Sequence, residues 1–139
     1  MPAVQFLPLR LPPGADLRVA LQEALRQAGT DSAFVVCGIG SLTGATLRYA
    51  GESVEATIPG PLEIVSLSGS LTRSGPHLHM SVSDASGRVW GGHVGLGNGV
   101  RTTAEILLAL LPEGTLAREH DAVTGFSELV IKRFPPEHR

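Results

Sequence analysis

Residues 76–97 read PHLHMSVSDASGRVWGGHVGLG, and this stretch decides the fold of the second half of the chain. Alternate side chains of a β-strand point to opposite faces, so the histidines and serines of residues 77–83 share one face and the apolar residues share the other. Asp84–Arg88 is typical of a three-residue hairpin loop with Gly87 in the left-handed conformation. The sequence therefore predicts an antiparallel hairpin, with Trp90 on its apolar face.

The predicted loop also determines which residues of the hairpin oppose each other. If Asp84 pairs with Arg88, then the same register places His79 directly opposite His93. Opposed β-carbons lie about 4.5–5.5 Å apart, a separation at which imidazoles can share a metal ion. His77 lies on the same face, so His77, His79 and His93 are the candidate metal ligands. The alternative is that they are hydrogen-bonded polar residues at a subunit interface.

Three imidazoles with a vacant fourth position form an open zinc site. Gly91 and Gly95 are expected to leave open space beside the rings. A reaction at such a metal also needs a general base within reach. Glu105 is the candidate for that base or for a fourth ligand. Its alternative role is that of a solvated or ion-paired edge residue, and we expect no catalytic role for it.

One helix is predicted, over residues 16–28. Asp16 is a suitable N-cap, apolar residues follow at helical spacing, and Gly29 supplies a left-handed stop. The helix has one apolar stripe and one charged side, formed by Arg18, Glu23 and Arg26, so it is expected to lie across a sheet.

Most of the remaining chain is predicted as strands. They are expected at residues 4–11, 33–37, 43–50, 54–58, 62–71, 77–83, 88–95 and 126–134. Residues 104–111, AEILLALL, fit a helix or a strand equally well by periodicity. The glycine-rich residues 38–44 and the Pro-Gly-Pro of residues 59–61 are interpreted as turns between strands.

The glycine-rich residues 38–44 follow an apolar strand, as a nucleotide-binding loop does. However, the third glycine comes one residue late for GxGxxG, and the pattern continues as strand, so no helix N-terminus would hold a pyrophosphate. No cofactor-binding residues are therefore predicted there.

Composition excludes several classes of protein. The chain has 139 residues, enough for one domain, with 11 basic and 13 acidic residues and a net charge of −2. Duplex-DNA binders usually carry a strongly basic face, so direct nucleic-acid binding is not expected. A solvated surface is the simplest explanation for the scattered arginines, which are Arg10, Arg48, Arg73, Arg88 and Arg101.

The expected location is the cytoplasm. The single cysteine, Cys37, cannot form an internal disulfide, and no stretch is apolar enough to cross a membrane. The first ten residues lack the pattern of a secretory signal. Cys37 follows three apolar residues and is expected to be buried and unreactive.

Motifs along nearly the whole chain resemble the plants-and-prokaryotes-conserved (PPC) domain family. The HxH of residues 77–79, the DxxG of residues 84–87 and the GGH of residues 91–93 form the most specific succession. The other matching segments are RLPPGADL (10–17), FVVCGIGSLTGATLR (34–48), GPLEIVSLSGSL (60–71) and TAEILL (103–108).

The resemblance implies an α+β fold in which a mostly antiparallel β-sheet packs against one main α-helix. It also implies a single domain over residues 1–139, with residues 135–139 as a loose tail, assembled as a homotrimer. Some family members hold a metal through histidines that match His77, His79 and His93. A trimer would also cover the edges that the apolar strands 62–71 and 104–111 are expected to expose.

Plant members of the family carry AT-hook segments and a partner-contacting segment similar to Gly-Arg-Phe-Glu-Ile-Leu. This chain has no Arg-Gly-Arg-Pro core, and residues 60–65 read GPLEIV, without the arginine and the phenylalanine. DNA binding therefore does not carry over.

Three functions follow as hypotheses. The first is a cytoplasmic homotrimer that binds a divalent metal, Zn²⁺, with its open coordination position facing a small-molecule pocket near a subunit boundary. The second is a regulatory scaffold associated with DNA through partner proteins. The third is a metal-dependent hydrolase or lyase acting on a small molecule.

Overall fold

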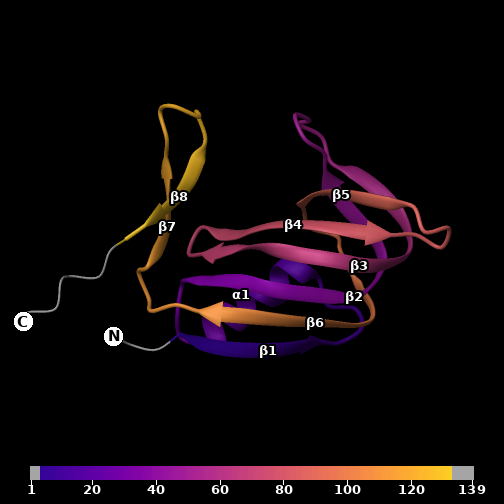
Figure 1. The fold of residues 1–139 in the computed structure, drawn as a ribbon, viewed down its shortest axis with the longest axis horizontal. Helices are drawn as coiled ribbons and strands as arrows, with labels where there is room; N and C mark the ends of the chain where they lie inside the picture. Colours follow the sequence, from indigo (N-terminus) through magenta and orange to yellow (C-terminus); the bar gives the residue numbers. More distant parts are fainter. Residues whose placement is uncertain (1–3, 133–139) are drawn as a thin grey trace, which may run out of the picture.

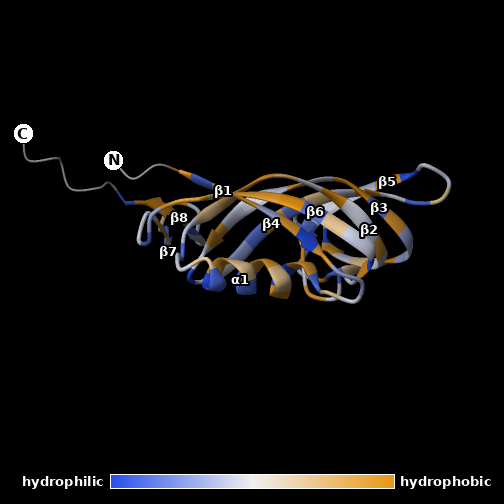
Figure 2. Cartoon of the chain, turned by 90° about the horizontal axis from the view of Figure 1, so that it is seen from below, coloured by the Kyte–Doolittle hydropathy of each residue, from blue (hydrophilic) through white to orange (hydrophobic). Residues whose placement is uncertain are grey.

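The structure is a computed structural model that describes residues 4–132. Six strands form one antiparallel sheet in the order β1-β6-β2-β3-β4-β5, and α1 packs against one face of it (Figures 1 and 2). The strands of this sheet are β1 (Gln5–Leu11), β2 (Ala33–Arg48), β3 (Ala56–Thr72), β4 (Gly75–Ser83), β5 (Val89–Val94) and β6 (Val100–Leu110). This arrangement confirms the mostly antiparallel sheet with one helix. The predicted tail, residues 135–139, lies outside the described residues.

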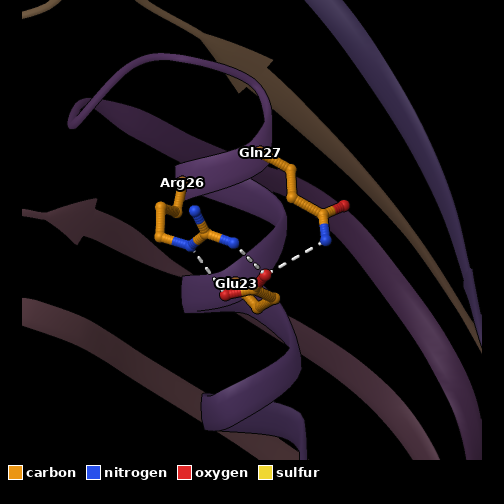
Figure 3. A network of polar contacts seen from close by, with 3 residues as sticks. All are labelled: Glu23, Arg26 and Gln27. Atoms are coloured by element: carbon orange, nitrogen blue, oxygen red, sulfur yellow. Dashed lines mark hydrogen bonds and ion pairs between the residues drawn. The ribbon is translucent and has the colours of Figure 1, made fainter.

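Helix α1 (Leu17–Gln27) forms as predicted and brings one apolar stripe to the sheet. The Asp16 carboxylate caps it by accepting from the Val19 N–H at 3.2 Å. The buried stripe consists of Leu17, Leu21 and Leu25. On the outer surface, Glu23 accepts hydrogen bonds from Arg26 and Gln27 (Figure 3).

The glycine-rich residues 38–44 are not a turn, and this corrects the sequence prediction. They run through the middle of β2, which continues from Ala33 to Arg48 as one strand with irregular register. A Cβ on Gly40 would lie 2.7 Å from the Ala104 Cα, so glycine is required there by close packing of β2 against β6.

Residues 59–61 likewise lie within a strand, so the two strands predicted on either side of them are one. β3 continues from Ala56 to Thr72. A Cβ on Gly60 would lie only 2.0 Å from the Thr43 carbonyl oxygen, because the two long strands approach closely there. The proline and glycine signals mark close approach and irregular pairing rather than the ends of strands.

Residues 104–110 of the segment that was ambiguous by periodicity belong to strand β6, which lies between β1 and β2; residue 111 follows the end of the strand. β3 is also internal, so neither apolar strand forms an exposed edge, contrary to expectation. Cys37 is exposed rather than buried; β2 shifts its register against β6 between Val35 and Cys37.

A second, two-stranded sheet stands at one end of the main sheet (Figure 1). Its strands are β7 (Leu116–His120), which the sequence pattern did not predict, and β8 (Ser127–Ile131), which was expected at residues 126–134. Among the described residues, no helix is long and apolar enough to span a bilayer.

The loop between β5 and β6 is attached to β2 by one buried amide. The Asn98 side chain accepts from the Thr46 N–H at 2.9 Å and donates to the carbonyls of Thr46 (3.2 Å) and Gly95 (2.9 Å). The second carboxylate oxygen of Asp16 accepts from the Gly97 and Asn98 N–H groups. These contacts hold the end of β5 against β2 and the start of α1.

We predict that Asn98→Ala lowers the free energy of unfolding by about 3 kcal/mol, because the Thr46 N–H and the Gly95 carbonyl lose their hydrogen-bond partner. Urea unfolding at neutral pH measures this loss. Gln27→Ala, which removes an exposed amide from α1, is the control and should change stability by less than about 0.5 kcal/mol. A loss for Asn98→Ala as small as that of the control would show that water replaces the amide.

Candidate metal centre

The β4–β5 hairpin has the predicted register. His79 lies opposite His93, and Val82 lies opposite Trp90. The Asp84 carboxylate accepts from the backbone N–H groups of Ser86 and Arg88, both at 2.9 Å, and Gly87 has a φ of +80°. The loop chemistry read from the sequence therefore determines which residues meet across the two strands.

Three histidines converge on the face of the hairpin that points away from the core. The ring centroids of His77 lie 5.1 Å from His79 and 5.3 Å from His93, and those of His79 and His93 are 5.8 Å apart. One nitrogen from each ring lies within 4.8 Å of the others. Between the histidines, Leu78 and Met80 point to the opposite face and are buried. The three rings are therefore close enough for one nitrogen of each to reach a single ion.

The histidines are also chemically suited to a metal. The Nδ1 atom of His93 is buried and has no hydrogen-bond partner. A buried nitrogen without a partner is costly unless something else satisfies it. Neutral imidazole is the most common protein ligand for zinc and similar metals. The donor set therefore fits a divalent transition metal.

Burial and neighbouring cations keep the His77 and His93 rings neutral. Burial is the main cause and the Arg48 guanidinium the second cause that lowers the pKa of His93 from 6.5 to about 4. Burial, followed by Arg118, lowers the pKa of His77, and the Glu128 carboxylate opposes this shift. At neutral pH both rings are uncharged, which is the form that binds metals.

Arg18 connects the strands that carry the histidines to α1. Its guanidinium donates to the carbonyl of Pro76, immediately before His77, at 2.9 Å, and to that of Val94, immediately after His93, at 3.2 Å. From the sequence, Arg18 belonged to the charged side of the helix. It is instead half-buried and holds the backbone on both sides of the cluster.

Arg118, from β7, contacts the cluster directly. One of its guanidinium nitrogens lies 2.9 Å from both His77 Nδ1 and Ser70 Oγ. The β7–β8 hairpin therefore lies against the histidine end of β4, although about forty residues separate Arg118 from His77. Nothing in the sequence pattern indicated this contact, because β7 has only five residues.

A hollow of about 360 Å³ opens beside the histidines, between the main sheet and the β7–β8 hairpin. This volume suits a small metabolite. Charged residues from three strands line it together with two of the histidines: Arg48, His77, His93, Arg118 and Glu128. Arg48 pairs with His93 across β2 and β5, so it faces the hollow rather than being only a surface residue.

Glu105, the carboxylate chosen from the sequence, is not brought to the histidines within one chain. It is exposed on β6 and lines an apolar hollow of about 820 Å³ bounded by β1, β2 and β3. Space beside Gly95 is also less open than expected, because the Glu55 carboxylate lies against it. Glu128 is the carboxylate that shares the histidine hollow.

Comparison with known proteins gives the family. A model of the Plants and Prokaryotes Conserved (PCC, also written PPC) domain matches residues 2–112. This chain belongs to the PPC-domain family. It is similar over 94% of its length, at 45% identity, to part of the Bifunctional protein GlmU from Synechococcus sp. strain JA-2-3B'a(2-13). The chain spans only 21% of the length of that relative.

Two solved structures share the PPC fold across nearly the whole chain. The hypothetical protein from Salmonella cholerae-suis is 38% identical with a TM-score of 0.89, covering 94% of both chains. The metal-containing protein AF0104 from Archaeoglobus fulgidus is 28% identical with a TM-score of 0.77, covering 91% of this chain and 93% of its own.

We predict that the metal-free protein loses stability as the pH falls from about 6.5 toward about 4. In this range the unfolded state binds a proton at His93 that the folded state does not bind, so acid favours unfolding. Thermal melting in the presence of a chelator, at several pH values, measures the slope.

His93→Gln should weaken this pH dependence, because glutamine does not titrate. His120→Gln, at the exposed end of β7, is the matched control and should keep the wild-type slope. Equal slopes for the wild type and His93→Gln would contradict the prediction.

Proposed function

We propose that this PPC-domain protein binds a divalent metal, Zn²⁺, through His77, His79 and His93. The observation that carries the proposal is the convergence of three imidazole nitrogens within 4.8 Å of one another. The His93 Nδ1 atom supports the proposal as well, because it is buried and has no hydrogen-bond partner. AF0104, a relative of known structure, is metal-containing, which agrees with the same chemistry.

Zinc held by three protein ligands keeps one coordination position for a water or a ligand and acts there as a Lewis acid. In this chain that position would face the hollow lined by Arg48, Arg118 and Glu128. The metal proposal therefore includes a small-molecule ligand at the fourth position.

We further propose that the protein acts as a homotrimer. Within residues 4–132 no helix covers the sheet face opposite α1 (Figure 2), and this face carries exposed apolar side chains. Val36, Ile39 and Val65 are each at least half exposed there, around the apolar hollow that Glu105 also lines. A contiguous apolar face of this kind is typical of a surface that another protein covers. Copies of the same chain are the occupant we propose.

A metal-dependent hydrolase or lyase would require a base near the metal. Glu128, rather than Glu105, has the position for that role within one chain. A regulatory scaffold acting on DNA through partners finds no specific support in the site, whose shape suits a small molecule. Binding of a divalent metal, with a small molecule at its open coordination position, is therefore the function that the geometry supports best.

We predict about one zinc per chain in untagged protein, measured by plasma mass spectrometry after removal of loosely bound metal. His79→Ala should lose this zinc, because two imidazoles bind the ion far more weakly than three do. Both His79 and His120 are exposed, so His120→Ala is a matched control that should keep full occupancy. Wild-type protein without metal, even after zinc is supplied, would refute the metal proposal.

We predict that Val36→Glu converts the trimer to monomer, because a carboxylate would be buried in the apolar interface. Analytical ultracentrifugation at micromolar concentration measures the mass. Val19→Glu, at a similarly exposed valine on the outer side of α1, should leave the trimer intact. A wild-type protein that sediments as a monomer would contradict the proposed assembly.

A further inference from the structure

The contact between Arg118 and His77 conflicts with metal binding. A guanidinium only donates hydrogen bonds, so His77 Nδ1 must be the acceptor in their 2.9 Å contact. A neutral imidazole has one nitrogen with a free lone pair, and its other nitrogen carries the proton. Arg118 therefore occupies the lone pair that His77 would offer to a metal.

A metal can bind His77 only if the Arg118 N–H leaves the ring. The guanidinium is fully charged at any pH of interest, so it cannot simply give up a proton and stay. Its bond to Ser70 Oγ does not satisfy all five of its N–H donors. The displaced guanidinium therefore needs a new acceptor close by.

The adjacent hollow has an excess of positive charge. Arg48 lines it from β2 and Arg118 from β7, while Glu128 from β8 is the acidic side chain among its lining residues. Arg18, from α1, donates to the Pro76 and Val94 carbonyls and adds a third positive charge nearby. A bound divalent ion would add two more positive charges. One carboxylate cannot balance this set.

We propose that the hollow binds a small molecule through a carboxylate or phosphoryl group, which bridges the metal and the Arg118 guanidinium. This inference rests on the proposed function, since the oxyanion takes the open coordination position. In the metal-free protein Arg118 is bonded to His77; in the loaded protein it is bonded to the oxyanion. Arg118 is thus both a competitor of the metal and a ligand-binding residue.

This dual role gives Arg118→Met an unusual pair of effects. Without any anion, the variant should bind Zn²⁺ about tenfold more tightly, because a charge-assisted hydrogen bond to His77 no longer competes. With metal bound, the same variant should bind an oxyanion at least about tenfold more weakly, because a charged donor is lost. A misfolded variant would lose both affinities, so the opposite signs identify the mechanism.

The experiment uses the full chain in two stages. Zinc affinity is measured by competition with a chromophoric chelator in a buffer without oxyanions. Acetate and methylphosphonate are then titrated separately into Co²⁺-loaded protein, and the visible absorption of the cobalt ion reports anion entry into its coordination shell. The two titrations distinguish a carboxylate ligand from a phosphoryl ligand.

Two further variants serve as controls. Arg26→Met removes a guanidinium from the exposed surface of α1, where its partner is Glu23, and should change neither affinity. Arg48→Met should weaken anion binding with a much smaller gain in zinc affinity than Arg118→Met, because Arg48 makes no hydrogen bond to a histidine ring; it donates to the Glu52 carbonyl.

The outcomes separate the inference from the proposed function. Zinc binding by the wild type that is equal in Arg118→Met, with no spectral response to either anion, overturns the oxyanion site and leaves the metal site standing. Absence of zinc binding by the wild type and by Arg118→Met overturns both. Tighter zinc with weaker anion binding supports the proposal.

Discussion

The register of the β4–β5 hairpin is the constraint on which the rest of the site depends. A slip of one residue would exchange the two faces, directing the histidines into the core and Leu78 and Met80 to the surface. The hydrogen bonds of Asp84 to its own loop and the left-handed Gly87 prevent that slip. Burial of the apolar face against α1 stabilises this register over the alternatives. The packing that forms the core therefore also places the histidines.

The surroundings of the histidines come from distant parts of the chain. α1 contributes Arg18, which holds the backbone on both sides of the cluster, and β7 contributes Arg118, which contacts His77. β2 contributes Arg48, placed beside His93 by its pairing with β5. These cations, together with burial, hold His77 and His93 in their neutral form. The same cations would repel a bare metal ion, and the oxyanion that we propose would balance their charge.

Glycine and proline misled the sequence prediction in a systematic way. The segments at residues 38–44 and 59–61 have turn-like composition, yet both lie inside long strands. Gly40 and Gly60 permit backbones to approach closely, Gly40 against Ala104 and Gly60 against Thr43. Glycine, which has no side chain, suits a tight turn and a close approach of two backbones equally well. Local sequence cannot distinguish the two, because the neighbouring strand that requires the space is distant along the chain.

The sequence alone predicts the helix at residues 16–28, the hairpin register and the meeting of His79 with His93. All of these follow from local rules: capping, helical periodicity, loop chemistry and the alternation of a strand. Only the tertiary structure decided that Arg18, Arg48 and Arg118 surround the histidines and that Glu105 does not. The reason is physical. A solvated arginine and an arginine that donates to a buried acceptor have the same local pattern, and they differ only in what the fold brings to them.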